Sequence, residues 1–172
     1  MSMNGFVLVG GWPAAGKTTV ARALAYEMGL AFLSKDEVKE ALMDRLGAPS
    51  TVAESRELGG AAVFAVLRAA RGCPGAVIDS TWFPYSLPLV RELPGPCVEV
   101  RCRVDVAVAR ERFRRRVRDG RHLDDARSEA ELWGAEVAPL GVGPLLEVDS
   151  SGRVDIGALA DRVRSALHAA SG

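Results

Sequence analysis

The sequence has no excess charge of either sign, no long apolar run and few cysteines. Lys plus Arg and Asp plus Glu number 22 each, so no overall field draws the chain toward nucleic acid or a membrane. No run approaches the roughly 20 apolar residues of a membrane-spanning helix, and no charged segment precedes the first apolar run. We therefore expect a cytoplasmic protein without a membrane partner. The three cysteines lack metal-ligand spacing, which favours reduced, mostly buried thiols.

The length and the composition predict one domain spanning residues 1–172. At about 150 residues per domain the chain has room for one core, and 48% hydrophobic with 26% charged residues excludes disordered, collagenous and coiled-coil classes. Short apolar runs alternate with segments of helical periodicity. We expect strands near 6–9, 31–34, 75–79, 97–102 and 145–148, and helices near 20–28, 36–46, 51–71, 105–118 and 156–167. This alternation predicts a three-layer α/β fold, a five-stranded parallel sheet with helices on both faces.

The residues from Gly11 to Thr18 form the strongest motif of the chain. They match G-x-x-x-x-G-K-[ST] between a predicted strand and a predicted helix, where loop amides converge on a phosphate. Lys17 would place positive charge at the β and γ phosphates, and the Thr18 hydroxyl would bind Mg²⁺. The predicted nucleotide contacts of this loop are Gly11, Pro13, Ala14, Ala15, Gly16, Lys17, Thr18 and Thr19. The alternative is a glycine-rich turn without a ligand.

Asp36 follows the second predicted strand, at the sheet edge where open α/β sheets bind ligands. A carboxylate there can orient an acceptor hydroxyl and take its proton, although Asp36 could instead cap the helix that follows. The only lysines of the chain, Lys17, Lys35 and Lys39, all fall near this site. Lys39 is either a substrate contact or a solvated helix lysine.

Asp79 ends a third apolar run and resembles an acid that holds Mg²⁺ together with Thr18. Its alternatives are a hydrogen bond to the acceptor or a turn cap with Ser80. Trp82 and Phe83 come next, and each is either an apolar wall of the acceptor pocket or part of the core.

Nine arginines and three acids lie between positions 101 and 121. So dense a cluster repels itself unless an anion or acids relieve it, and the polyphosphate of ATP would do so. Arg112 and Arg116 lie four apart on one helical face, with Arg121 just beyond, which predicts a lid near 112–128 with arginines over the transferring phosphate. Arg116 is the candidate catalytic arginine, and nucleic-acid phosphate is the competing ligand. The two histidines, His122 and His168, indicate no histidine catalysis.

With these motifs the chain resembles the adenylate-kinase-like branch of small P-loop kinases over nearly its whole length. Within that branch it is similar to chloramphenicol phosphotransferases, which share the Gly10–Gly11 pair and the acid at Asp36, and to the kinase domain of polynucleotide kinases. The resemblance implies strand order 2-3-1-4-5, Mg-ATP as donor and a hydroxyl deprotonated by Asp36. Lys39 matches a basic substrate contact of the polynucleotide kinases, and the run 112–116 resembles the start of a nucleotide-kinase lid.

Two departures favour a hydroxyl kinase over a nucleotide kinase: residues 12–15 contain no glycine, and no signature of a nucleoside-monophosphate pocket is present. We therefore expect an ATP- and Mg²⁺-dependent phosphotransferase acting on a hydroxyl of a small molecule, such as an antibiotic or another natural product. The alternatives are a 5′-hydroxyl polynucleotide kinase and a nucleotide-dependent switch ATPase, in which Asp36 would be dispensable.

Overall fold

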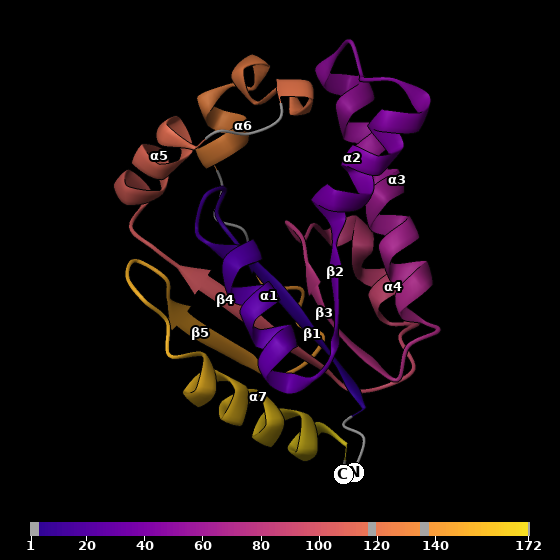
Figure 1. The fold of residues 1–172 in the computed structure, drawn as a ribbon, viewed down its shortest axis with the longest axis vertical. Coiled ribbons are helices and arrows are strands. Elements are labelled where there is room, and N and C mark those ends of the chain that lie inside the picture. Colours follow the sequence, from indigo (N-terminus) through magenta and orange to yellow (C-terminus); the bar gives the residue numbers. More distant parts are fainter. Residues whose placement is uncertain (1–3, 117–119, 135–137, 172) are drawn as a thin grey trace.

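The computed structural model describes residues 4–116, 120–134 and 138–171, and its strands form a parallel sheet (Figure 1). The five strands pair in the order β2-β3-β1-β4-β5. They are β1 (Gly5–Gly11), β2 (Ala31–Ser34), β3 (Gly75–Asp79), β4 (Cys97–Arg103) and β5 (Leu145–Asp149). The predicted strands, their parallel pairing and the strand order implied by the resemblance are confirmed. Because the strands are parallel, their carboxyl ends meet at one edge of the sheet.

Helices cover both faces of the sheet and arch over its carboxyl edge (Figure 1). The helices are α1 (Lys17–Met28), α2 (Lys35–Leu46), α3 (Val52–Ala70), α4 (Leu87–Val90), α5 (Val106–Arg115), α6 (Glu129–Trp133) and α7 (Ile156–Ala170), with short 3-10 turns η1 (Pro84–Ser86), η2 (Gly120–His122) and η3 (Asp124–Ala126). Helices α5 and α6 lie above the end of the sheet, toward α2 and α3. In the described part of the chain no helix combines the length and apolarity needed to cross a membrane.

The sheet separates two apolar cores. Val7 and Val9 of β1 face the core shared with α1 and α7, whereas Phe6 and Leu8 face the core shared with α3 and α4. All four side chains are fully buried, as expected for a central parallel strand covered on both sides. The two cores hold β1 in place, so the loop that follows it begins from a rigid support.

Local capping explains where several helices begin and end. The Ser34 hydroxyl accepts a hydrogen bond from the Glu37 amide at the start of α2, and Thr51 forms a capping box with Glu54 at the start of α3. Asp155 caps α7, where its side chain accepts a hydrogen bond from the amide of Ala158. Helix α5 ends at Arg115, earlier than the predicted position 118, because Arg116 adopts an extended conformation with ψ 137°. The last two positions of that prediction lie outside the described residues.

The three cysteines are free thiols within the described structure, as predicted. Burial raises the pKa of Cys97 to about 11 and that of Cys102 to about 12. Both thiols are therefore protonated at neutral pH, which makes them weak nucleophiles and weak metal ligands.

The buried carboxylate of Glu99, on β4, holds the segment that leads into β5. Its two oxygens accept hydrogen bonds from the amides of Leu140, Gly141 and Val142 at 2.6, 2.7 and 3.0 Å. Glu99 is only 4% exposed, so these amides compensate for the water that the charge has lost. Leu140 lines the cavity described below, so Glu99 also holds part of the wall of that cavity in place.

Replacing Glu99 with Gln should lower the free energy of unfolding by about 1–3 kcal/mol, because the Gln amino group cannot accept hydrogen bonds and would face buried N–H donors. Urea unfolding followed by circular dichroism measures this change. The control is Glu147→Gln, which removes a charge from β5 whose ion pair with Arg103 is about half exposed, at 52% and 50%. Equal unfolding midpoints for the two variants would contradict this account of Glu99.

Candidate active site

A cavity of about 740 Å³ opens at the carboxyl edge of the sheet. Its size lies within the range of about 300–1,000 Å³ that is typical of small-molecule sites. The lining residues come from five segments of the chain, within 13–19, 35–39, 79–87, 112–132 and 138–140. The cavity thus brings together the glycine-rich loop, the start of α2, the end of β3 and the arginine-rich segment.

The glycine-rich loop has the backbone conformation of an anion-binding cradle. Gly11 has a φ of 141°, and a Cβ there would lie 2.6 Å from the carbonyl oxygen of Cys102. Ala14 takes a left-handed φ of 56° although it is not glycine. Gly16 precedes α1 with a φ of 85°, and among the described residues no side chain caps this helix. The first amides of α1 are therefore left for a ligand, and the helix dipole favours an anion there.

Lys17 is the half-buried cation of this loop. Its Nζ donates a 2.8 Å hydrogen bond to the carbonyl oxygen of Trp12. Burial lowers the pKa of Lys17, while the nearby carboxylates of Asp79 and Asp36 oppose that shift and Arg116 adds to it. Lys17 therefore lies within the electrostatic reach of two acids and one arginine, all at the cavity.

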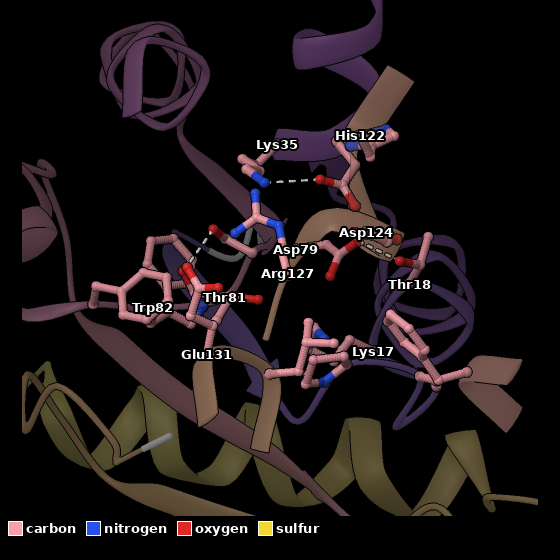
Figure 2. A pocket seen from close by; sticks show the side chains of 18 of the residues that line it. Lys17, Thr18, Lys35, Asp79, Thr81, Trp82, His122, Asp124, Arg127 and Glu131 are labelled. Carbon is pink, nitrogen blue, oxygen red and sulfur yellow. Dashed lines mark hydrogen bonds and ion pairs between the residues drawn. The ribbon is translucent and has the colours of Figure 1, made fainter. Parts of the chain in front are cut away.

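Thr18 and Asp79 are hydrogen-bonded to each other in the cavity wall (Figure 2). The Thr18 hydroxyl donates a 2.6 Å hydrogen bond to Oδ2 of Asp79, and Ser34 donates a longer one, of 3.5 Å, to the same oxygen. Burial raises the pKa of Asp79, against the lowering effects of Thr18 and Lys17. A hydroxyl and a carboxylate at one point form the hard oxygen set that Mg²⁺ prefers. The residues present therefore fit Mg²⁺ beside the phosphate cradle.

Asp36 does not cap α2, since Ser34 does. Its carboxylate instead forms a 2.9 Å ion pair with Lys35 in the cavity wall. The charge of Asp36 opposes the lowering of the Lys17 pKa by burial and adds to the raising of the Asp79 pKa, so these three groups form one electrostatic cluster. The capping alternative for Asp36 is thereby removed, and its catalytic role stays a prediction.

Lys39 is buried rather than solvated. It is 2% exposed, and its Nζ donates a 2.7 Å hydrogen bond to the hydroxyl of Ser55 on α3. It also forms part of the cavity wall, together with Lys17 and Lys35. All three lysines of the chain therefore gather at one cavity. A substrate contact through Lys39 remains a prediction.

Of the three arginines predicted to bind phosphate, two reach the cavity. Arg112 donates hydrogen bonds to the carbonyl oxygens of Ser150 and Ser151. Arg116 forms a 3.0 Å ion pair with Asp124 and lies over the ring of Phe113. Both line the cavity, but among the described residues of its wall Arg121 is absent.

Acids relieve much of the repulsion within the arginine-rich segment. Glu111 pairs with Arg114 and Arg115 within α5, and Glu129 of α6 pairs with Arg110. The predicted self-repulsion is therefore compensated inside the protein to a large extent. The cluster as a whole is not evidence for a large external polyanion.

Trp82 combines the two roles between which the sequence left a choice. It is 5% exposed and belongs to a core, and its Nε1 donates a 3.1 Å hydrogen bond to the carbonyl oxygen of Val9. Trp82 also lines the cavity. Phe83 lines it too, and 48% of this residue is exposed.

An aromatic cluster joins the glycine-rich loop to the segment above it. Trp133 of α6 contacts Trp12 of the loop and Phe113 of α5, with ring centroids 5.8 and 5.7 Å apart. The guanidinium of Arg110 lies 5.7 Å from the Trp133 ring centroid. The cavity wall also includes Ala130 and Leu132, which follow the predicted lid at 112–128. Positions 117–119 of that predicted lid lie outside the described residues.

The segment of residues 120–134 also contacts α2 and α3, and the sequence did not predict these contacts. His122 is 2% exposed, and its Nε2 lies 2.8 Å from Oε1 of Glu40. Ser55 donates to the carbonyl oxygen of His122, and Arg121 pairs with Asp44 at 2.7 Å. A lone histidine gives no sequence signal for a partner 82 positions away.

Removing the buried contact should loosen this attachment more than removing the exposed one. We expect His122→Ala to speed amide hydrogen exchange in residues 120–134 roughly tenfold, as the loss of a packed, hydrogen-bonded side chain implies. Arg121→Ala should have a smaller effect, because exposed ion pairs contribute only about 0–1 kcal/mol. Mass spectrometry of peptic fragments measures both variants. Equal protection in the wild type and His122→Ala would show that His122 does not anchor the segment.

The strand order, with the glycine-rich loop between β1 and α1, defines the P-loop kinase fold. In sequence, residues 6–136 match the family described as AAA domain, and the chain belongs to that family. A candidate kinase from Chloroflexus aurantiacus J-10-fl is 30% identical, with a TM-score of 0.78 and 99% of each chain covered. No curated protein matches the chain in sequence.

Two more distant structures share the fold. A gluconokinase from Sinorhizobium meliloti 1021 is 17% identical, with a TM-score of 0.62 over 99% of this chain and 94% of the other. The APS kinase CysC of Mycobacterium tuberculosis, in complex with AMPPNP and APS, is 17% identical, with a TM-score of 0.63 over 98% of this chain and 99% of the other. The chain is therefore related in fold to kinases of small molecules.

Proposed function

We propose that the protein is an ATP- and Mg²⁺-dependent phosphotransferase that acts on a hydroxyl of a small molecule. The observation that carries this proposal is the position of Asp36, in the same cavity as Lys17, Thr18 and Asp79 and within their electrostatic reach. The phosphate cradle, Lys17 and the oxygen pair of Thr18 and Asp79 would serve the phosphate donor. The additional carboxylate, Asp36, would serve the hydroxyl acceptor in the same cavity. We further propose that residues 1–172 act as one kinase domain with a lid near 112–128.

On the donor side, the loop amides and Lys17 would hold the β and γ phosphates of ATP. Arg112 and Arg116 line the same cavity and would add positive charge near the transferring group. Thr18 and Asp79 would hold Mg²⁺, which neutralises phosphate charge when bound. To do so, the Thr18 hydroxyl would exchange its 2.6 Å hydrogen bond with Asp79 for the cation. Lys17 would likewise leave the carbonyl oxygen of Trp12 for a phosphate oxygen.

On the acceptor side, Asp36 would orient the hydroxyl and take its proton during transfer. Its ion pair with Lys35 fixes the carboxylate at the cavity wall, which favours the positioning on which phosphoryl transfer depends. Trp82 and Lys39 would form part of the acceptor wall. The gluconokinase and the APS kinase that share this fold are named for small substrates, which supports a small acceptor.

ADP formation by the purified protein tests the proposal, measured with Mg²⁺ and ATP and with or without acceptors. The acceptors are aminoglycosides, amphenicols, nucleosides and a 5′-hydroxyl oligonucleotide, with mass spectrometry to detect an added phosphate. We expect phosphate on a small compound. Labelling of the oligonucleotide, with a rate that falls steeply as salt rises, would favour a polynucleotide kinase instead. Hydrolysis unchanged by every acceptor would favour a switch ATPase.

A further inference from the structure

The side of the cavity beyond Asp79, as seen from Lys17, has an apolar wall. In Figure 2, Trp82 and Thr81 lie on one side of Asp79, and Lys17 and Thr18 lie on the other. Apolar side chains from three segments line this part of the site: Trp82, Phe83, Pro84 and Leu87 after β3, Leu132 of α6, and Pro139 with Leu140 before β5. The wall is continuous with the apolar core that contains Trp82 and, at its margin, Leu140.

Several residues of this wall are not covered by other parts of the protein. Phe83 is 48% exposed, and Leu87 and Leu140 are half-buried. Apolar surface of this kind gains about 25 cal/mol per Å² when a ligand removes it from water. The wall can therefore contribute binding free energy to an apolar group.

Charged side chains also line the cavity, among them Arg127, which Figure 2 places beside Asp79 and Thr81 and which has a partner within the protein. Lys35 pairs with Asp36, and Glu131 pairs with Arg56 of α3. A polyhydroxylated molecule placed against the apolar wall would lose hydrogen bonds to water, because aromatic and aliphatic side chains cannot replace them. The apolar body of a molecule whose single hydroxyl is directed at Asp36 has no hydrogen bonds to water to lose at this wall.

We infer that the acceptor is an alcohol with an apolar aromatic or alicyclic body, rather than a sugar or a sugar acid. This inference rests on the kinase function proposed above and specifies its substrate class. The acceptor oxygen would form a bond to the γ phosphorus of ATP, and the bond from that phosphorus to the β–γ bridging oxygen would break. ADP would leave with the electron pair of that bond, and the hydroxyl proton would pass to the Asp36 carboxylate.

Binding and turnover measured with the same acceptors separate this inference from the proposed function. Calorimetry in the presence of Mg²⁺ and AMPPNP measures the affinity of amphenicol, phenylpropanoid and monoterpene alcohols against glucose, gluconate and shikimate. We expect at least one apolar alcohol to bind roughly tenfold or more tightly than every polyhydroxylated compound, as contacts to a hydrophobic pocket imply. Tighter binding of a polyhydroxylated compound, or binding of no apolar alcohol, would overturn the inference. Turnover of the bound compound tests the kinase function separately.

Substitutions in the wall provide the second arm of the test. Leu87→Asn and Phe83→Ser should weaken the apolar alcohol roughly tenfold while AMPPNP binds as before, and the exposed position of Phe83 keeps its variant foldable. The control is Leu46→Asn at the end of α2, where the leucine is 72% exposed. Unchanged alcohol affinity in both wall variants would overturn the assignment of this wall to the acceptor.

Discussion

Lys17→Met should lower kcat by about 100- to 1,000-fold, the usual effect of removing one preorganised charge from a transition state. The Nζ of Lys17 lies at the cavity, hydrogen-bonded to the carbonyl oxygen of Trp12, and burial lowers its pKa. In such an environment a positive charge acts on a phosphate more strongly than it would in water. Steady-state ADP formation measures the change, and equilibrium binding of AMPPNP determines how much of it is lost affinity.

Arg22→Met is the control for Lys17→Met. It removes a cation from the same helix, where Arg22 pairs with Glu37 and both side chains are more than half exposed, at 62% and 63%. Its activity should equal that of the wild type. Lys17→Arg should not restore activity, because a planar guanidinium does not replace a compact ammonium in a buried position. Activity close to wild type in Lys17→Met, with the fold intact, would remove the phosphate-binding role from this loop.

Asp36→Asn should reduce transfer to a hydroxyl acceptor by about 100- to 10,000-fold, the range of a positioned general base. The amide keeps the size of the side chain but cannot take the proton. The KM for ATP should stay near its wild-type value, because Asp36 lies in the wall at α2 rather than in the phosphate loop. Single-turnover transfer, measured beside AMPPNP affinity, separates the two quantities.

Glu37→Gln is the neighbouring control, since Glu37 pairs with Arg22 at the surface and should not affect transfer. If Asp36→Asn lost nucleotide binding while remaining folded, the assignment of Asp36 to the acceptor would be wrong. If it hydrolysed ATP at the rate of the wild type and no acceptor ever changed that rate, the protein would be a switch ATPase.

The sequence predicted the elements whose signals are local. The five apolar runs became the five strands. The signal is strongest for the central strands β1 and β3, which are buried on both faces and apolar along most of their length, whereas the edge strands β2 and β5 are only partly buried. The Gly11–Thr18 motif carries its own geometry, so the phosphate cradle could be expected from spacing alone. The strand order came from a family resemblance rather than from periodicity.

The contacts between distant segments could not be predicted in the same way. The burial of Lys39 depends on the packing of α2 against α3, where Ser55 meets its Nζ. The attachment of His122 to Glu40 depends on the path of the chain between α5 and α6. From its charge, Arg121 was predicted to bind phosphate, whereas in the structure it forms an ion pair with Asp44. Each outcome depends on tertiary neighbours, and no pattern within a short segment encodes them.

The contact between Trp12, on the phosphate loop, and Trp133, in the segment above it, has a practical consequence for experiments. The chain has three tryptophans, and the third, Trp82, forms part of the apolar wall. The glycine-rich loop, helix α6 and the apolar wall therefore carry one tryptophan each. Ultraviolet emission from the unlabelled protein can therefore report the arrival of each ligand, and single Trp→Phe variants would assign each signal to its place.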